Sequence, residues 1–187
     1  MKFRVLVAVV AVLLVLQVVA GELAGVSMPD EVSVGGRTLV LNGLGLREAT
    51  WMKVDVYVAG LYLVEKTTDA QAIVDSDEAK QIVMKFVRKV KKKSITGAWD
   101  EGFEKNAGNV GKALAERVEQ LNSYMVDFKK GDTMSFTYVS STGVQVVVNG
   151  DSKGTIEGQD FARVLWSIWL GPEPPNPGIK SGMLGLD

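Results

Sequence analysis

Alternating apolar and polar positions predict most of the strands in this chain. Residues 31–42 alternate around Gly35 and Gly36, the pattern of a β-hairpin with a two-residue glycine turn. Residues 53–63 are rich in Val and Tyr with a period of two, and residues 80–87 carry apolar side chains on one face. Residues 132–156 repeat the strand pattern with turn signals between its parts. We therefore expect an antiparallel sheet that ends in a β-meander.

Helical periodicity separates these strands. Ile95, Trp99, Phe103 and Asn106 recur at spacings of 4, 4 and 3 residues, which is one stripe of a helix entered at Ser94. Residues 110–121 form a second stripe, residues 68–74 predict a short helix, and residues 159–170 predict the last helix of the chain. The order of strands, helices, strands and helix predicts an α+β domain with helices over one face of the sheet and a ligand cleft between the two layers.

The N-terminus has the pattern of a secretory signal. Lys2 and Arg4 precede an apolar run over residues 5–16, and small residues end at Ala20. We expect a signal peptide over residues 1–20, a domain over residues 21–187 and a periplasmic or secreted protein, with Ala24 as a second candidate for the cleavage position. An uncleaved membrane anchor is the alternative.

Composition narrows the chemistry. The chain contains no cysteine and no histidine, which excludes disulfides, a thiol nucleophile, a Ser-His-Asp triad and the usual zinc sites, so we expect no metal or other cofactor. Residues 21–187 contain 19 basic and 22 acidic residues, a net charge of −3. This mild acidity argues against nucleic acid and against an anionic membrane as partners. We also expect no stable membrane insertion once the signal is removed.

Two short motifs suggest functions that the residues support poorly. Five of the six residues 88–93 are basic, a run that could bind nucleic acid or lipid headgroups. They connect a strand to a helix and have no aromatic residues among them, so we interpret them as a solvated connection without a function. Gly43 and Gly45 resemble half of a dinucleotide fingerprint, but a strand follows them. These glycines are better explained by a bulge or a close backbone approach.

Arg47, Tyr57 and Asn106 are the polar candidates for a binding site. If the chain reverses near Met52, Arg47 and Tyr57 lie opposite each other and offer a guanidinium and a phenol to one carboxylate. Without that reversal the two side chains are far apart, and Arg47 is an ordinary exposed arginine. Asn106 follows an apolar stripe, so it either ends the helix or donates to a ligand oxygen.

Four segments in order resemble the bacterial chalcone isomerase-like proteins. They are Asn42-Gly-Leu-Gly-Leu-Arg47, Val-Tyr57-Val-Ala-Gly-Leu-Tyr62-Leu, Trp99-Asp-Glu-Gly-Phe-Glu-Lys-Asn106, and the ending from Phe161 to Gly171. The resemblance spans nearly the whole predicted domain and implies an open-faced antiparallel sheet packed with helices. Plant chalcone isomerases use an arginine and an asparagine that this chain keeps as Arg47 and Asn106.

The resemblance implies a non-catalytic branch, because other isomerase positions differ. Tyr57 stands where those enzymes have a strand threonine, Trp99 where they have a tyrosine, and Ala162 where they have a late hydroxyl residue. Ordered donors stabilise the enolate of the cyclisation, so their loss disfavours catalysis. Non-catalytic relatives bind fatty acids with an arginine and a tyrosine on the carboxylate, and Arg47 with Tyr57 resembles that pair.

Three functions follow as hypotheses. The leading one is the binding of a small amphipathic carboxylate, such as a fatty acid, by the ligand-binding residues Arg47, Tyr57, Trp99, Phe103 and Asn106, with no catalytic residue. The second is an intramolecular lyase of the chalcone isomerase type. The third is an envelope protein that binds a protein partner through its proline-rich segment, residues 171–178, and the nearby Trp166 and Trp169.

Overall fold

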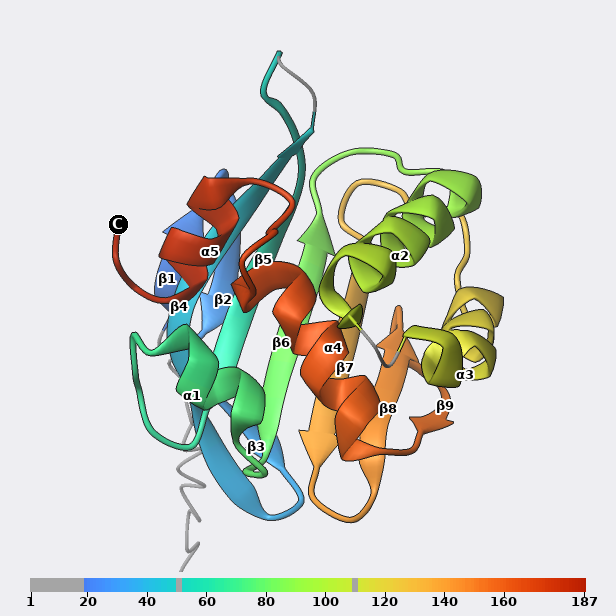
Figure 1. Cartoon of the computed structure of the whole chain (residues 1–187). Coiled ribbons are helices and arrows are strands. Elements are labelled where there is room, and N and C mark those ends of the chain that lie inside the picture. The colour runs from blue at the N-terminus through green and yellow to red at the C-terminus, as the bar shows by residue number, and fades with distance from the viewer. Residues whose placement is uncertain (1–18, 50–51, 109–110) are drawn as a thin grey trace, which may run out of the picture.

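The computed structural model of the protein describes residues 19–49, 52–108 and 111–187 (Figure 1). Within these residues the strands are β1 (Val19–Leu23), β2 (Val26–Pro29), β3 (Glu31–Val34), β4 (Arg37–Ala49), β5 (Val54–Leu63), β6 (Lys80–Phe86), β7 (Thr133–Val139), β8 (Gly143–Val148) and β9 (Asp151–Ile156). The helices are α1 (Ala70–Asp75), α2 (Lys92–Asn106), α3 (Gly111–Ser123), α4 (Gln159–Leu170) and α5 (Pro177–Met183).

Strands β3 to β9 form one sheet in chain order, and each strand is antiparallel to its neighbours. The predicted hairpin around Gly35 and Gly36 is confirmed as β3–β4, and both glycines have positive φ, which a two-residue hairpin turn needs. The predicted meander over residues 132–156 is also confirmed, as β7–β8–β9. Because every connection joins adjacent strands, the whole sheet is a meander.

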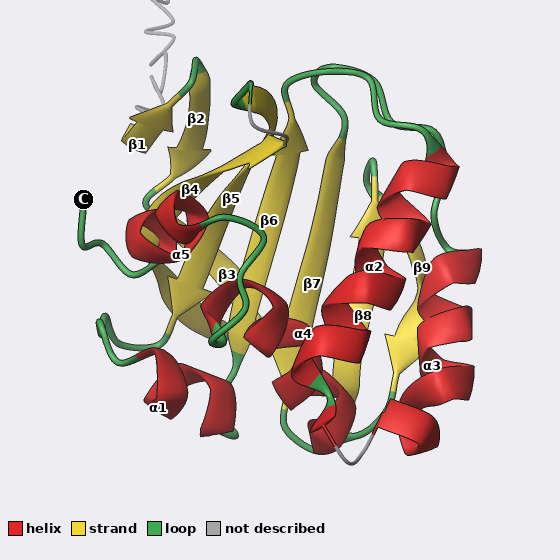
Figure 2. Cartoon of the chain, turned by 45° about the horizontal axis from the view of Figure 1, so that its top comes forward, coloured by secondary structure: helices red, strands yellow, loops and turns green. Residues whose placement is uncertain are grey.

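The helices cover one face of this sheet (Figures 1 and 2). The main core lies between the two layers and contains the large buried side chains Trp99, Trp166, Trp169, Tyr138, Phe86, Phe128, Phe136 and Phe161. The rings of Trp99 and Trp169 meet edge to face with centroids 5.6 Å apart, so α2 and α4 pack on each other as well as on the sheet. The expected α+β architecture is confirmed.

The hairpin β1–β2 lies on the opposite face of the sheet, over β4 and β5. Val26 and Met28 pack there against Val58, and the Tyr62 hydroxyl donates to the carbonyl of Pro29 at 3.0 Å. This explains why both faces of β5 are buried, with Tyr57, Ala59 and Leu61 toward the helices and Val58 and Tyr62 toward β1–β2.

The predicted helix over residues 159–170 has the bounds of α4, but it is not the last helix, since α5 follows it. The backbone of α5 lies directly on β4. A Cβ on Gly43 would lie 2.2 Å from the carbonyl oxygen of Gly182, and one on Gly45 would lie 2.2 Å from that of Ile179. The interpretation of these glycines as a site of close backbone approach is therefore correct, and the proline-rich segment leads back onto the domain.

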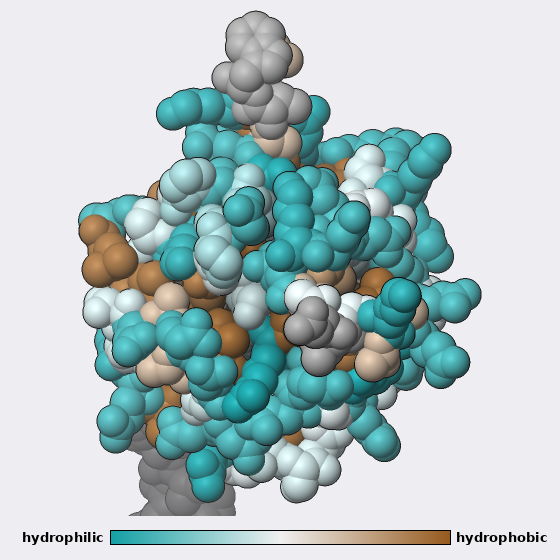
Figure 3. All heavy atoms as spheres, in the orientation of Figure 1, coloured by the Kyte–Doolittle hydropathy of each residue, from teal (hydrophilic) through white to brown (hydrophobic). Residues whose placement is uncertain are grey.

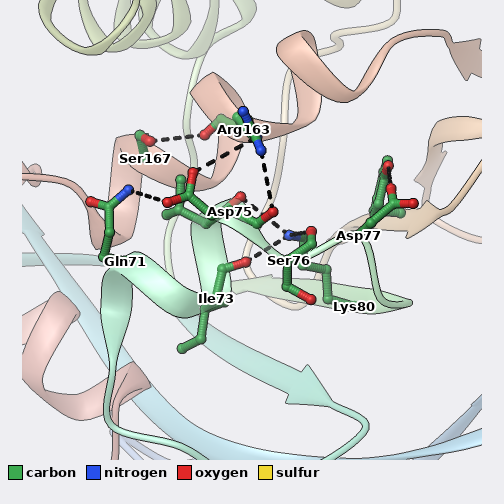
Figure 4. Close-up of polar contacts among 10 residues, drawn as sticks. Gln71, Ile73, Asp75, Ser76, Asp77, Lys80, Arg163 and Ser167 are labelled. Atoms are coloured by element: carbon green, nitrogen blue, oxygen red, sulfur yellow. Dashed lines mark hydrogen bonds and ion pairs between the residues drawn. The ribbon is translucent and has the colours of Figure 1, made fainter.

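Polar contacts connect α1 to the sheet and to α4 (Figure 4). The buried ammonium of Lys80, on β6, donates to the carbonyls of Ile73 at 2.6 Å and Ser76 at 2.7 Å and so satisfies the C-terminal end of α1. Arg163 on α4 lies 3.7 Å from the carboxylate of Asp75. Lys80 is thus a structural lysine of the helix layer.

The predicted signal peptide lies outside the described residues, apart from residues 19 and 20 at the start of β1. Cleavage after Ala20 would leave Gly21, Glu22 and Leu23 paired with β2, whereas cleavage after Ala24 would remove β1 entirely. Among the helices of the described residues, none is both long and apolar enough to cross a membrane.

Candidate functional site

A cavity of about 440 Å³ opens between the β4–β5 hairpin, residues 88–91, one side of α2 and the segment that follows α4. Its apolar walls are formed by Val56, Val90, Ile95, Ala98, Trp99, Ile168, Pro174 and Pro175. Arg47 and Tyr57 add polar groups to this lining. An apolar cavity of this size with a few polar groups is typical of a site for a small organic ligand.

Arg47 and Tyr57 are directly opposite each other in the antiparallel pairing of β4 with β5. The expected reversal of the chain near Met52 is therefore confirmed. Directly opposed residues of an antiparallel pair project from the same face of the sheet, and here that face borders the cavity. The guanidinium-bearing and phenol-bearing residues therefore lie side by side on adjacent strands at the border of the cavity.

The hydroxyl of Tyr57 is oriented by α4. Nε1 of Trp169 donates to the Tyr57 hydroxyl oxygen at 3.1 Å. Burial raises the pKa of Tyr57 to about 12, although the bond from Trp169 and the charge of Arg47 both act to lower it. Tyr57 is therefore protonated at neutral pH. In the described part of the chain no group accepts its hydroxyl proton, so this proton can be donated to a ligand.

Arg47 is half-buried, and its Nη1 donates to the backbone carbonyl of Glu48. No carboxylate within the described residues forms an ion pair with it. The charge of Arg47 reaches Glu101, whose pKa is lowered first by its contact with Lys105, at 2.5 Å, and also by Arg47. The guanidinium therefore keeps donors for an anionic ligand.

Asn176 holds the backbone on both sides of Arg47. Its Nδ2 donates to the carbonyl of Leu46 at 3.0 Å, and its Oδ1 accepts from the backbone N–H of Glu48 at 3.2 Å. These bonds attach the segment after α4, including the cavity residues Glu173, Pro174 and Pro175, to β4. Nothing in the sequence pattern pointed to this residue, because an Asn-Pro pair has the pattern of an ordinary turn.

The other predicted ligand residues divide into two groups. Trp99 lines the cavity, and its Nε1 donates to Sδ of Met125 at 3.2 Å. The cavity lining does not include Phe103, which stacks on Phe161 with centroids 5.1 Å apart. It does not include Asn106 either, whose Nδ2 donates to the Gly102 carbonyl at 2.9 Å at the end of α2.

Basic residues border the cavity at positions that the sequence interpretation had left without a function. Arg88, Lys89, Lys91 and Lys105 belong to its lining. Tyr57 pairs with Phe86 across β5 and β6, so the residues after Phe86 lie beside the Arg47–Tyr57 pair. The segment 88–93 is indeed exposed, but it is also part of the cavity rim. The sequence did contain a signal for this rim: the basic run 88–93 directly follows the strand that pairs with the strand of Tyr57.

Comparison with known proteins identifies the family. The family model described as chalcone isomerase-like matches residues 20–185, so the chain belongs to the chalcone isomerase-like family. Among solved structures, a fatty-acid binding protein of Arabidopsis thaliana superposes with a TM-score of 0.71 at 17% identity, covering 86% of this chain and 92% of its own. None of the curated proteins compared with the chain matches it. The expected chalcone isomerase-like fold is thus confirmed.

Proposed function

We propose that this protein is an exported, non-catalytic binding domain for a small amphipathic carboxylate such as a fatty acid. The observation that carries the proposal is the Arg47–Tyr57 pair, which projects from adjacent strands into a largely apolar cavity. The carboxylate accepts charge-assisted bonds from Arg47 and one bond from the Tyr57 hydroxyl. Its hydrocarbon part contacts Val56, Ile95 and Trp99.

Two comparisons support this assignment. The chain belongs to the chalcone isomerase-like family, and a solved structure with the same fold is that of a fatty-acid binding protein. At 17% identity the second comparison supports the fold, and the transfer of its ligand class to this chain rests on Arg47 and Tyr57.

A non-catalytic role is supported by the residues of this chain at the positions where plant chalcone isomerases have hydroxyl side chains. Trp99 fills one such position with an indole bonded to Met125. Ala162 fills a second such position and is buried in α4 outside the cavity lining. Tyr57, with its pKa raised to about 12, is a poor proton acceptor near neutral pH. The site therefore offers donors that hold an anion, and Tyr57 does not supply a base for an enone cyclisation.

The partner-binding alternative loses its main support. The proline-rich segment that suggested it walls the cavity and leads into α5, which packs on β4. Trp166 and Trp169, its expected flanking residues, are fully buried in the core. Both features have a structural role inside the domain.

Organic extraction of the purified protein followed by mass spectrometry tests the proposal. We expect a long-chain carboxylic acid to co-purify with the wild type and to be depleted in Arg47→Ala. Arg37→Ala is the matched control, because Arg37 is an exposed arginine at the β3–β4 turn, away from the cavity. Empty wild-type protein that also fails to bind added fatty acids would refute the assignment, and turnover of chalcones that depends on Arg47 would favour the isomerase alternative.

A further inference from the structure

One end of the molecule is strongly basic. Three loops lie at this end: residues 52–53 between β4 and β5, residues 87–93, which join β6 to α2 and include the first two residues of α2, and residues 124–132 between α3 and β7 (Figure 1). We call these three loops the basic end. They contain eight basic and two acidic residues, whereas the rest of the chain contains 13 basic and 20 acidic residues. A nearly neutral net charge thus conceals a polarised distribution.

Backbone and ion-pair contacts join two loops of the basic end, residues 87–93 and residues 124–132. Val90 and Phe128 exchange two backbone bonds, of 3.0 and 2.8 Å, and Lys91 forms an ion pair with Asp127 at 2.8 Å. The basic side chains of these loops are all exposed. In Figure 3, hydrophilic side chains cover the upper right of the molecule, where α2 begins in Figure 1. The charge therefore lies on a defined surface.

Several of these lysines act against local stability. Lys92 and Lys93 occupy the first turn of α2, which contains no acidic residue. The N-terminus of a helix carries positive partial charge, so acidic side chains stabilise it and basic ones destabilise it. One carboxylate from another loop offsets this effect: Oδ1 of Asp127 accepts from the backbone N–H of Lys92 at 2.9 Å, and Oδ2 of Asp127 pairs with Lys91. The side chains of Lys92 and Lys93 form no ion pair among the described residues, so they can meet an external anion.

Apolar side chains accompany the charge. Across the described residues, the exposed large hydrophobic side chains are Met52, Val126 and Leu186, and the first two lie on the basic end. Met52 is 61% exposed at the tip of the β4–β5 hairpin. Exposed apolar side chains within a basic region match the interface of an anionic bilayer, where apolar groups enter below the charged headgroups.

We propose that the basic end docks reversibly on an anionic lipid bilayer, with the mouth of the cavity facing the membrane. Arg88, Lys89 and Lys91 belong both to the basic end and to the cavity lining, so docking brings the cavity to the lipid surface. The choice of a bilayer over other polyanions rests on the proposed function, because the proposed ligand is an amphipath that partitions into bilayers. Docking itself can be measured without that ligand.

Co-sedimentation with vesicles tests the proposal. The probes are vesicles of equimolar phosphatidylcholine and phosphatidylglycerol, and vesicles of phosphatidylcholine alone. We expect binding to the anionic vesicles only, weakened by added salt. The combined variant Lys92→Glu, Lys93→Glu, Lys130→Glu should lower the partition coefficient roughly tenfold or more, because each basic residue near an anionic surface contributes to binding. None of the three lysines lines the cavity, so binding of a soluble fatty acid should be unchanged.

The matched control is Arg37→Glu, Lys66→Glu, Lys112→Glu, which changes the net charge equally at exposed positions away from the basic end. All variants share one N-terminus, so any contribution of residues 1–18 cancels. Equal losses in both triple variants, or tighter binding to a single-stranded oligonucleotide than to anionic vesicles, would overturn the proposal. Arg47→Ala separates the two functions, since it should abolish fatty-acid binding and leave docking on ligand-free vesicles intact.

Discussion

The indole of Trp169 donates a 3.1 Å hydrogen bond to the hydroxyl oxygen of Tyr57, and this contact determines what Tyr57 can offer a ligand. A hydroxyl that already accepts from a buried donor on α4 directs its own proton elsewhere. Tyr57 lies opposite Arg47 and borders the cavity, so that proton is available on the side where the guanidinium is. Trp169 thereby orients the Tyr57 hydroxyl, which is one of the two proposed donors to the carboxylate.

Tyr57→Phe should weaken both ligand binding and folding. The ring stays, but one neutral donor to the carboxylate is lost, which reduces the binding free energy by about 0.5–1.5 kcal/mol. The buried Trp169 N–H also loses its acceptor, which lowers the free energy of unfolding by about 1–3 kcal/mol. Isothermal titration with a fatty acid and urea denaturation measure the two effects. Tyr124→Phe is the control, because the Tyr124 hydroxyl accepts only an exposed bond from Gln120. Unchanged stability in Tyr57→Phe would contradict the role given to Trp169.

Arg47→Ala should weaken ligand binding far more than it weakens folding. A charge-assisted contact to a carboxylate is worth about 2–5 kcal/mol when one partner is removed, which corresponds to about 30-fold to several thousandfold in affinity. Arg47 has no ion pair among the described residues, so its removal relieves a partly desolvated cation. We expect the ligand-free variant to melt at or above the wild-type temperature in calorimetry. A clearly lower melting temperature with unchanged affinity would show that Arg47 is structural.

The pairing of Arg47 with Tyr57 could be predicted from the sequence, because in an antiparallel hairpin the register follows once the position of the reversal is assumed. The bounds of α4 were predictable from a long amphipathic pattern ended by Gly171 and a proline. A close backbone contact at Gly43 and Gly45 could be predicted, because glycine within a strand often marks a contact with another backbone. The sequence did not show which backbone approaches.

Other features depend on tertiary contacts that no local pattern reveals. Helix α5 has a proline and two glycines among its seven residues, a composition that disfavours a helix, and it forms against β4. Phe103 and Asn106 share a stripe with Trp99, but the cavity is lined mainly by the adjacent side of α2, which includes Ala98, Gly102 and Lys105. Phe103 instead stacks on Phe161 of α4. The stripe correctly predicts a buried helix face. Only the structure shows where that face borders a cavity and where it borders the core.

Gly45→Ala should detach α5 and weaken ligand binding indirectly. A Cβ at Gly45 would lie 2.2 Å from the Ile179 carbonyl oxygen, so α5 must shift. That shift would disturb Asn176, which begins α5 and holds the backbone around Arg47. We expect a loss of about 1–3 kcal/mol in unfolding free energy, typical of overpacking, together with lower affinity.

Gly178→Ala is the control for Gly45→Ala. It lies within α5 itself, where the nearest atom to an added Cβ, the Asn176 Nδ2, is at an ordinary contact distance of 3.6 Å. Alanine is the better helix former, so stability should stay equal or rise. Proteolysis at the C-terminus, followed by mass spectrometry, reports on α5 directly. Equal protection of α5 in Gly45→Ala and the wild type would show that β4 and α5 adapt to the added methyl group.

The buried Lys80 should make the protein more stable as the pH rises above 8. Burial, with a smaller contribution from the charge of Arg163, lowers the pKa of Lys80 from 10.5 to about 8 in the folded state. Between about pH 8 and 10.5 the folded protein has released this proton while the unfolded chain still binds it, so the free energy of unfolding increases with pH, by at most about 1.4 kcal/mol per pH unit. Below pH 8 both states bind the proton, and the contribution no longer changes.

Tyrosines reverse this trend at higher pH. Burial raises the pKa of Tyr57, Tyr62 and Tyr138 from 10 to about 12. Above pH 10 the unfolded chain therefore loses these protons first, and the free energy of unfolding falls.

Urea denaturation at intervals from pH 7 to 10 isolates the window in which Lys80 acts. We expect the unfolding free energy of the wild type to rise across pH 8 to 10 relative to that of Lys80→Met, which keeps an apolar side chain at the site and cannot titrate. Parallel curves for the two proteins would show that Lys80 stays protonated in the folded state, held by the carbonyls of Ile73 and Ser76 at the end of α1.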